Sequence, residues 1–319
     1  MKFRVERDVL AEAVTWVARG VPARPSVPVL AGILINADAE GSITLSAFDY
    51  EVSARITVPA DVQDAGTVLV LGRLLSDISR NLPAKPVEFS TSGNKVDVTC
   101  GSSRFSLMQM PEGDFPTLPT APEASGTIDG GAFTQAVAQV AIAADRGDTL
   151  PILTGVRVEI DGDKMTLLAT DRYRLAMREL HWNPAATDAN QVLLVPGRTL
   201  LDTAKSLGTT GSIDLAFGGA AGGDGLVGFE AGQRRSTTRL LDGEYPKVSS
   251  IFPTSSETEV VLATADLVEA VKRVALVAER NTPVRLKFGE GQVAIEAGTG
   301  DDAQASEAVE ATLTGPDLE

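Results

Sequence analysis

The stretch LPILTGVRVEIDGDKMTLLATDRYRLAMREL (Leu150–Leu180) contains the unit from which the whole chain is built. In 156–160, Val and Ile alternate with Arg and Glu, which is the period of a half-buried strand. The Asp-Gly-Asp turn at 161–163 predicts a hairpin to a second apolar strand. The unit therefore consists of an apolar lead segment, two antiparallel strands and a polar corner at 170–175.

The same order occurs twice more. Val27–Ile56 (VPVLAGILINADAEGSITLSAFDYEVSARI) has the apolar lead, the alternating strand, the acidic-Gly turn and a corner at Asp49. Residues 282–311 repeat the pattern more loosely. Self-similarity of this kind indicates repeated structural units.

An amphipathic helix is predicted before each copy, because apolar residues recur at i, i+4, i+7 and i+11. The three stripes are Leu10, Val14, Val17 and Val21, then Phe133, Val137, Val140 and Ala144, then Leu267, Val271, Val274 and Ala278. We expect Thr264 to be the N-cap of the third helix.

Pro-rich joints at 115–122 and 245–253 separate the copies. They predict three domains, 1–120, 121–253 and 254–319. The first two have a second helix-and-strand half. The third stops before that half begins, which predicts a truncated domain. One helix alternating with antiparallel strands indicates an α+β class, in which strands could pair across copies with the helices on the other face.

Composition limits the function. Hydrophobic residues make up 43% of the 319, and no apolar run reaches the roughly 18 residues needed to span a membrane. The N-terminus lacks a signal-peptide core, and the single cysteine, Cys100, fits a reduced cytoplasm. The net charge of −15 argues against tight phosphate binding.

The second helix of each complete copy carries a basic face. Arg73, Asp77 and Arg80 lie on one side of a helix, at i, i+4 and i+7. Arg198, Asp202 and Lys205 recur 125 residues later. One interpretation is a solvated face with ion pairs. The other is a repeated basic surface that faces a polyanion.

We find no catalytic set. His181 is the only histidine, so His-based metal sites and Ser-His-Asp triads have almost nothing to build on. Carboxylates are scattered, zinc-ligand spacing is absent and aromatics are only 5%. The sequence predicts a protein that is not an enzyme and needs no metal or cofactor.

The polar corner at 170–175 has two interpretations. Asp171 could bond the local backbone in an Asx-type turn. Alternatively the corner could orient a peptide in a surface groove. The apolar walls of that groove would be Leu153, Leu175, Pro246 and Ile251.

These residues closely resemble the bacterial sliding clamp family, the beta subunits of DNA polymerase III. The resemblance covers essentially the whole chain, and the composition resembles an actinobacterial member. The segments that carry it are MKFRVERDVL, RPSVPVLAGILI, SRFSLMQMPEGDFPTLP, LLATDRYRLAMRE and LLDGEYPKVSSIFP. The resemblance implies a DNA-clamp fold and a head-to-tail homodimer ring, with helices lining the hole and sheets outside. It also implies a processivity factor that encircles duplex DNA without sequence preference.

The resemblance implies three sets of site residues. The DNA-facing set is Arg24, Arg73, Arg80, Arg146, Arg198, Lys205, Lys272 and Arg273. The groove for the replicative polymerase, the clamp loader and other clamp-binding peptides is Leu153, Thr170, Arg172, Tyr173, Arg174, Leu175, Pro246, Ser250 and Ile251. The dimer interface is Arg104, Phe105, Leu276, Asp301, Asp302 and Glu307.

Arg172-Tyr173 departs from the Gly-His that other members often have, and Ser250 stands where others have a basic residue. Partner preference is therefore open. Two rival hypotheses remain: a repeat scaffold that binds proteins but not DNA, and an enzyme whose active site lies at the Asp171 corner.

Overall fold

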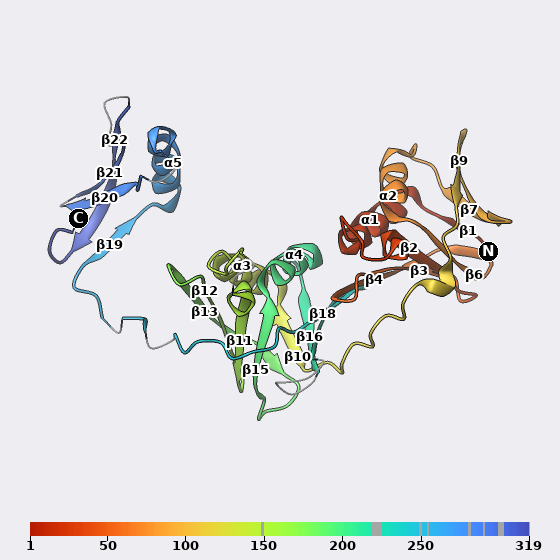
Figure 1. Cartoon of the computed structure of the whole chain (residues 1–319), viewed down its shortest axis with the longest axis horizontal. Helices are drawn as coiled ribbons and strands as arrows, with labels where there is room; N and C mark the ends of the chain where they lie inside the picture. Colours follow the sequence, from red (N-terminus) through yellow and green to blue (C-terminus); the bar gives the residue numbers. More distant parts are fainter. Residues whose placement is uncertain are drawn as a thin grey trace. The chain divides into compact units, whose positions relative to one another are not determined.

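The computed structural model describes residues 1–147, 150–218, 225–248, 251–253, 255–279, 282–289, 291–298 and 303–318. The chain forms two compact units, Met1–Tyr245 and Pro246–Glu319 (Figure 1). The first unit contains the first two sequence copies. The domain boundaries expected at 120 and 253 stay predictions.

In the first copy, two helices pack against each other, α1 (Arg7–Val17) and α2 (Gly72–Asn81). Part of this copy forms a five-stranded sheet in the order β5-β1-β7-β8-β9. The strands of the copy are β1 (Lys2–Val5), β2 (Gly32–Ala37), β3 (Ser42–Phe48), β4 (Val52–Pro59), β5 (Asp61–Asp64), β6 (Gly66–Leu71), β7 (Val87–Ser92), β8 (Lys95–Cys100) and β9 (Ser103–Met108).

The second copy repeats this plan with α3 (Gly130–Ala141) and α4 (Gly197–Leu207), which again pack together. Four of its strands form a sheet in the order β13-β12-β11-β15. Its strands are β10 (Gly126–Asp129), β11 (Gly155–Asp161), β12 (Lys164–Thr170), β13 (Leu175–His181), β14 (Asn183–Pro184), β15 (Asn190–Pro196), β16 (Ser212–Gly218), β17 (Leu226–Ala231) and β18 (Arg234–Arg239).

A nine-stranded sheet joins the two copies in the order β14-β10-β16-β17-β18-β4-β3-β2-β6. At the junction, β18 pairs antiparallel with β4, from Arg234 opposite Ile56 to Thr238 opposite Val52. The expectation that strands pair across copies is thus confirmed for the first two. The same junction makes them one unit with a continuous apolar core.

Side chains from both copies also meet beside this junction. The carbonyl oxygen of Ser206, in the last turn of α4, accepts from the Trp16 indole N–H at 3.1 Å and from Arg234 at 3.0 Å. Arg234 also pairs with Glu12 of α1 and lies 5.9 Å from the centre of the Trp16 ring. A cation at a helix C-terminus is favoured by the helix dipole. We call these four residues the seam clasp.

The second unit has one α-helix, α5 (Thr264–Val274), among its described residues. Its sheet has the order β19-β22-β21-β20, with β19 (Glu259–Leu262), β20 (Arg285–Gly289), β21 (Gln292–Ala297) and β22 (Ala305–Thr314). Val274 of α5 packs on Val293 and Ile295 in a separate small core. The expected N-cap was wrong by one residue, because Ala263 is the N-cap and no side chain caps the helix.

In the described ranges, no helix is long and apolar enough to cross a membrane. Over the same ranges, no group of three or more His, Cys, Asp or Glu side chains is placed to hold a metal ion. His181 is a surface residue whose Nδ1 lies 3.5 Å from the Asp163 carboxylate.

Candidate functional surfaces

The corner between β12 and β13 is an Asx-type turn, as one of the two interpretations predicted. Asp171 Oδ1 accepts the backbone N–H of Tyr173 at 3.1 Å and that of Arg174 at 3.0 Å. Its other oxygen pairs with the Arg174 side chain at 2.9 Å. The turn places Arg172 in the left-handed region, with φ 79°.

The first copy has the same corner. Asp49 Oδ1 accepts the N–H of Glu51 at 3.0 Å and that of Val52 at 2.6 Å. Tyr50 then takes φ 75° in the place of Arg172. In the described part of the chain, these two are the only non-glycine residues with positive φ. Such backbone costs roughly 1–3 kcal/mol and persists only where the surroundings enforce it.

The carboxyl of Asp171 is held ionised. Partial burial acts to raise its pKa, but the backbone N–H groups of Arg174 and Tyr173 and the Arg174 side chain outweigh it. The pKa of Asp171 therefore lies below its ordinary value. The ionised form is the one that accepts the bonds of the turn.

Tyr245 fixes this corner from a distance of 75 residues along the chain. Its phenol oxygen accepts the backbone N–H of Thr170 at 2.9 Å, and burial raises the pKa of the phenol. The Thr170 hydroxyl donates to the carbonyl of Arg174 at 2.8 Å. The sequence analysis missed Tyr245, although Glu244-Tyr245-Pro246 matches Asp114-Phe115-Pro116 in the first copy.

The predicted groove residues differ in exposure. Leu153 and Thr170 are buried, Leu175 is half-buried, and Tyr173 is 90% exposed. Arg172 and Arg174 are also exposed at the corner. Pro246 and Ile251 are exposed and belong to the second unit, and Ser250 lies outside the described residues.

The corner of the first copy is not supported by polar side chains of this kind. Phe48 stands in the place of Thr170, and it packs with Leu30, Leu69 and Phe115 in its own apolar cluster. Phe48 and Phe115 are both buried. Phe48 and Phe115 thus take the places of Thr170 and Tyr245 in the second copy.

Both basic helix faces are exposed, and both carry an ion pair; the pair on α4 has the predicted i,i+4 spacing, whereas the pair on α2 joins residues at i,i+3. Arg80 lies 2.6 Å from Asp77 on α2, and Arg198 lies 4.0 Å from Asp202 on α4. The Arg198 side chain is 96% exposed. Exposed pairs of this kind contribute little, so the charges stay available to a partner.

The structure brings three predicted DNA-facing residues together. Arg146, Arg198 and Lys205 line one hollow of about 710 Å³ between the C-terminal end of α3 and α4. Ile142 and Leu201 form part of its apolar wall. Arg73 and Arg80 of α2 and Arg24 are exposed elsewhere in the unit and do not line this hollow.

Arg19 was missed by the sequence analysis. It is exposed after the end of α1 and lines a smaller hollow of about 200 Å³ together with Arg198. The repeat spacing could not reveal it, because Ile142 and Leu276 hold the matching places in the other copies.

On α5, both basic residues have acidic partners. Lys272 lies 2.8 Å from Glu269, and Arg273 Nε donates to Glu307 at 3.0 Å. The hydrogen bond between these two side chains lowers the pKa of Glu307 and raises the pKa of Arg273. The expected role of Arg273 at DNA and that of Glu307 at the dimer interface stay predictions. In the structure these two residues bind each other.

Two predicted interface residues lie on β9, an edge strand. Arg104 is exposed and Phe105 is 39% exposed. The matching residues of β18, Arg235 and Ser236, lie where that strand pairs with β4, and Ser236 is buried there. On the second unit Leu276 is 83% exposed, whereas Asp301 and Asp302 lie outside the described residues.

Three family models match consecutive parts of the chain. They describe the N-terminal, central and C-terminal domains of the DNA polymerase III beta subunit, at residues 1–119, 127–247 and 249–319. The beta sliding clamp of Streptomyces coelicolor is 59% identical over 318 residues, which cover 100% of this chain and 84% of that protein. The beta sliding clamp of Micrococcus luteus is 57% identical, with coverage of 98% and 100%.

A solved structure agrees with these matches. It is the sliding clamp of Pseudomonas aeruginosa, a DNA polymerase III beta subunit, bound to griselimycin. The fold superposes with a TM-score of 0.87 at 26% identity, over 100% of this chain and 86% of that chain.

Proposed function

This chain belongs to the family of bacterial DNA polymerase III beta subunits, the sliding clamps, and we propose how its surfaces carry out that function. It is a non-catalytic processivity subunit that encircles duplex DNA as a homodimer ring and binds the replicative polymerase. We place it in the cytoplasm, with the clamp loader and other clamp-binding peptides as further partners.

One observation carries the assignment of the DNA-facing surface. The chain has a net charge of −15, yet α2 and α4 each present two basic residues and one acidic residue on an exposed face. Arg146 adds a third cation to the α4 face. Local cations of this kind attract a polyanion even on an acidic protein, because exposed charges act over about one Debye length, roughly 8–10 Å.

A ring explains why so few cations suffice. Affinity for DNA that rests on phosphate contacts rises with the number of contacts and falls with salt. A protein closed around the duplex is held topologically, so weak contacts are enough and they permit sliding. The bulk acidity then repels DNA from the other faces.

We assign partner binding to the corner at 170–175 and its apolar neighbours. The Asx-type turn fixes the backbone, so the exposed Tyr173 and Arg172 are presented in a set orientation. The first copy supports no similar groove because Phe48 and Phe115 fill the matching place. The relative from Pseudomonas aeruginosa binds griselimycin, and the groove is where we expect a similar ligand here.

Charge reversal tests the DNA-facing assignment. We expect Arg73→Glu, Arg80→Glu, Arg198→Glu and Lys205→Glu together to abolish polymerase processivity, because the helix faces would then repel phosphate. The matched control reverses four exposed cations away from these faces, namely Arg4, Arg55, Lys85 and Arg178. Both variants change the net charge equally.

The result separates the rival hypotheses. A scaffold that does not bind DNA predicts that both variants behave alike and that processivity is unchanged. An enzyme at the corner predicts turnover without any polymerase that Asp171→Asn abolishes. Loss of processivity in the helix variant alone supports the clamp.

A further inference from the structure

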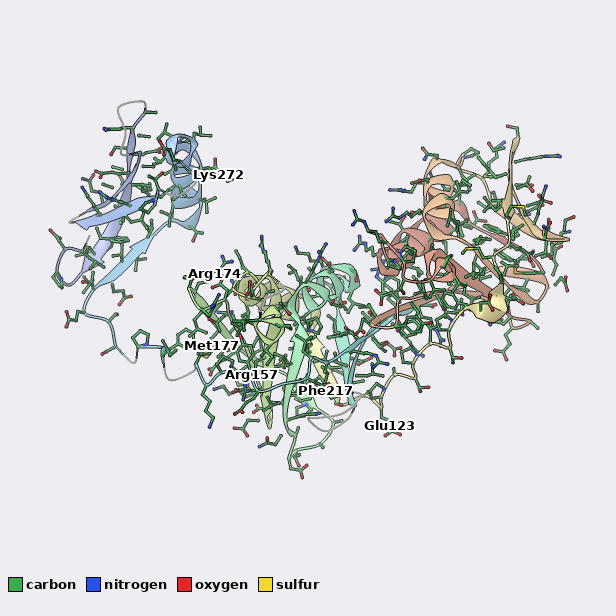
Figure 2. The ribbon with its side chains drawn as sticks, viewed as in Figure 1. Glu123, Arg157, Arg174, Met177, Phe217 and Lys272 are labelled. Carbon is green, nitrogen blue, oxygen red and sulfur yellow. The ribbon has the colours of Figure 1, made fainter. Side chains whose placement is uncertain are left out.

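A third hollow lies in the second copy, away from both the helix faces and the partner groove. Its volume is about 460 Å³, and it is lined by the segment 123–125, Trp182, the loop 185–189 and residues of β11, β15 and β16. Glu123 and Phe217, which both line it, lie at the end of the strands that points away from α3 and α4 (Figure 2). We call it the Trp182 hollow.

The floor of the Trp182 hollow is apolar and aromatic. Trp182 and Ile160 are each 3% exposed, and the Trp182 and Phe217 rings meet edge to face with centroids 5.7 Å apart. The indole N–H of Trp182 already donates to the carbonyl of Gly162 at 3.0 Å. Because Trp182 and Ile160 are buried, the apolar surface that the hollow exposes is that of half-buried Phe217 and of the alanines of the loop 185–189, and it suits an apolar side chain.

The walls are held open by backbone hydrogen bonds. The loop 185–189 is tied at one end by the Ala185 N–H to Ser125 O, 2.7 Å, and at the other by the Gly162 N–H to Ala189 O, 2.8 Å. The exposed wall residue Ala186 is small and leaves the entrance open. A preformed hollow of this kind costs little ordering entropy when a ligand enters.

The charge around the entrance has one sign. Glu123 stands on the rim, and Asp188 lies in the loop 185–189. Among the described residues that line the hollow there is no Lys or Arg. Complementarity favours a cationic ligand and disfavours DNA.

We propose that the Trp182 hollow is a second protein-docking site, which takes an extended basic segment of a partner protein. One apolar side chain of that segment rests on Phe217, whose ring contacts the buried Trp182, and flanking Lys or Arg residues lie against Glu123 and Asp188. The lining of the hollow shares no residue with the predicted partner groove or with the predicted DNA-facing set.

The chain contains two tryptophans, Trp16 and Trp182, which gives a direct readout. Protein labelled with 5-fluorotryptophan gives two ¹⁹F signals, and Trp16, at the seam clasp, is the internal reference. The probe is a five-residue peptide with a central leucine between two pairs of arginines. We expect it to move the Trp182 signal, saturably, and to leave the Trp16 signal in place.

Two further peptides and three variants complete the test. A peptide with serine in place of the central leucine, and one with glutamates in place of the arginines, are expected not to saturate the signal. Glu123→Lys is expected to weaken binding about threefold or more, whereas the matched control Glu112→Lys, an exposed acid in the first copy, leaves it unchanged. Ala186→Trp is expected to fill the hollow and abolish binding.

Three results would overturn the proposal. The first is no movement of the Trp182 signal by the basic leucine peptide at millimolar concentration. The second is equal binding of the serine peptide, which would mean nonspecific attraction of cations. The third is equal weakening by Glu123→Lys and Glu112→Lys, which would mean that net charge alone decides.

Discussion

At the scale of single residues, the two corners explain why left-handed backbone recurs in this chain. Tyr50 and Arg172 both follow an aspartate whose carboxylate accepts two backbone N–H groups ahead of it. The turn needs positive φ at that place, and a side chain there is strained. Glycine is the residue that adopts positive φ without that strain.

Arg172→Gly is therefore expected to stabilise the protein. Relief of the strain, roughly 1–3 kcal/mol, exceeds the added chain entropy of glycine, roughly 0.5–1 kcal/mol. The free energy of unfolding from urea titration should rise by about 1 kcal/mol. Tyr173→Gly, one residue on, relieves no strain and should not raise it. A lower stability for Arg172→Gly would contradict the strained-turn account.

The Asp171 corner should respond to acid in a defined direction. The folded-state pKa of Asp171 lies below the ordinary value of 3.8. Its contribution to stability is thus complete above that value and is lost as the pH falls through the lower, folded-state pKa. The amide proton shifts of Tyr173 and Arg174 should move together, with a midpoint below 3.8. Asp171→Asn should remove this transition, and a midpoint above 3.8 would refute the ionised turn.

Local sequence could predict the turn but not everything that supports it. Asp171 bonds to residues two and three places ahead, so residue types alone suggested an Asx-type turn. Tyr245 meets Thr170 across 75 residues, and no local pattern reports such a contact. Arg19 was missed for another reason, because the residues at the matching positions of the other two copies are not basic.

At the scale of elements, the seam clasp holds α1, α4 and β18 together. Trp16 and Arg234 both donate to the Ser206 carbonyl at the C-terminus of α4. Arg234 also pairs with Glu12, so one side chain links both copies. The side chain of Arg234 is only 24% exposed, so solvent screens these bonds less than those of a surface pair.

Arg234→Met keeps the length of the side chain and removes its charge and donors. We expect the free energy of unfolding to fall by about 1–3 kcal/mol. Hydrogen exchange of the amides in the last turn of α4 should accelerate. Arg235→Met, on the exposed neighbour that pairs with Glu230, serves as the control. Equal effects of the two substitutions would mean that the seam clasp contributes no more to the free energy of unfolding than an exposed ion pair does.

The helices and hairpins followed from periodicity, because each is set by residues near in sequence. The apolar stripes predicted α1, α3 and α5, and the alternation predicted the β11–β12 hairpin. The register of β18 on β4 could not be derived in this way. That register depends on buried Ser236 lying opposite Ala54 and on buried Thr237 lying opposite Ser53. Thr237 and Ser53 are 184 residues apart in the sequence.

At the scale of the whole molecule, ring closure needs an interface between two copies. We expect β9 to supply one side of it, because Phe105 and Met108 are exposed on an edge strand whose counterpart, β18, is covered. Phe105→Asp should convert the dimer to a monomer of 33.3 kDa by light scattering, since a buried unpaired charge is costly. Met177→Asp, exposed on β13, should leave the dimer intact. A dimer that survives Phe105→Asp would place the interface elsewhere.

The central claim is that the protein holds DNA by encircling it. The most direct measurement loads it, with clamp loader and ATP, on a nicked circular plasmid and on the same plasmid made linear, then washes with high salt. The account predicts retention on the circle and rapid loss from the linear DNA, because a ring leaves only over an end. Equal retention on both, or equal loss from both as the salt rises, would contradict it and indicate ordinary electrostatic binding.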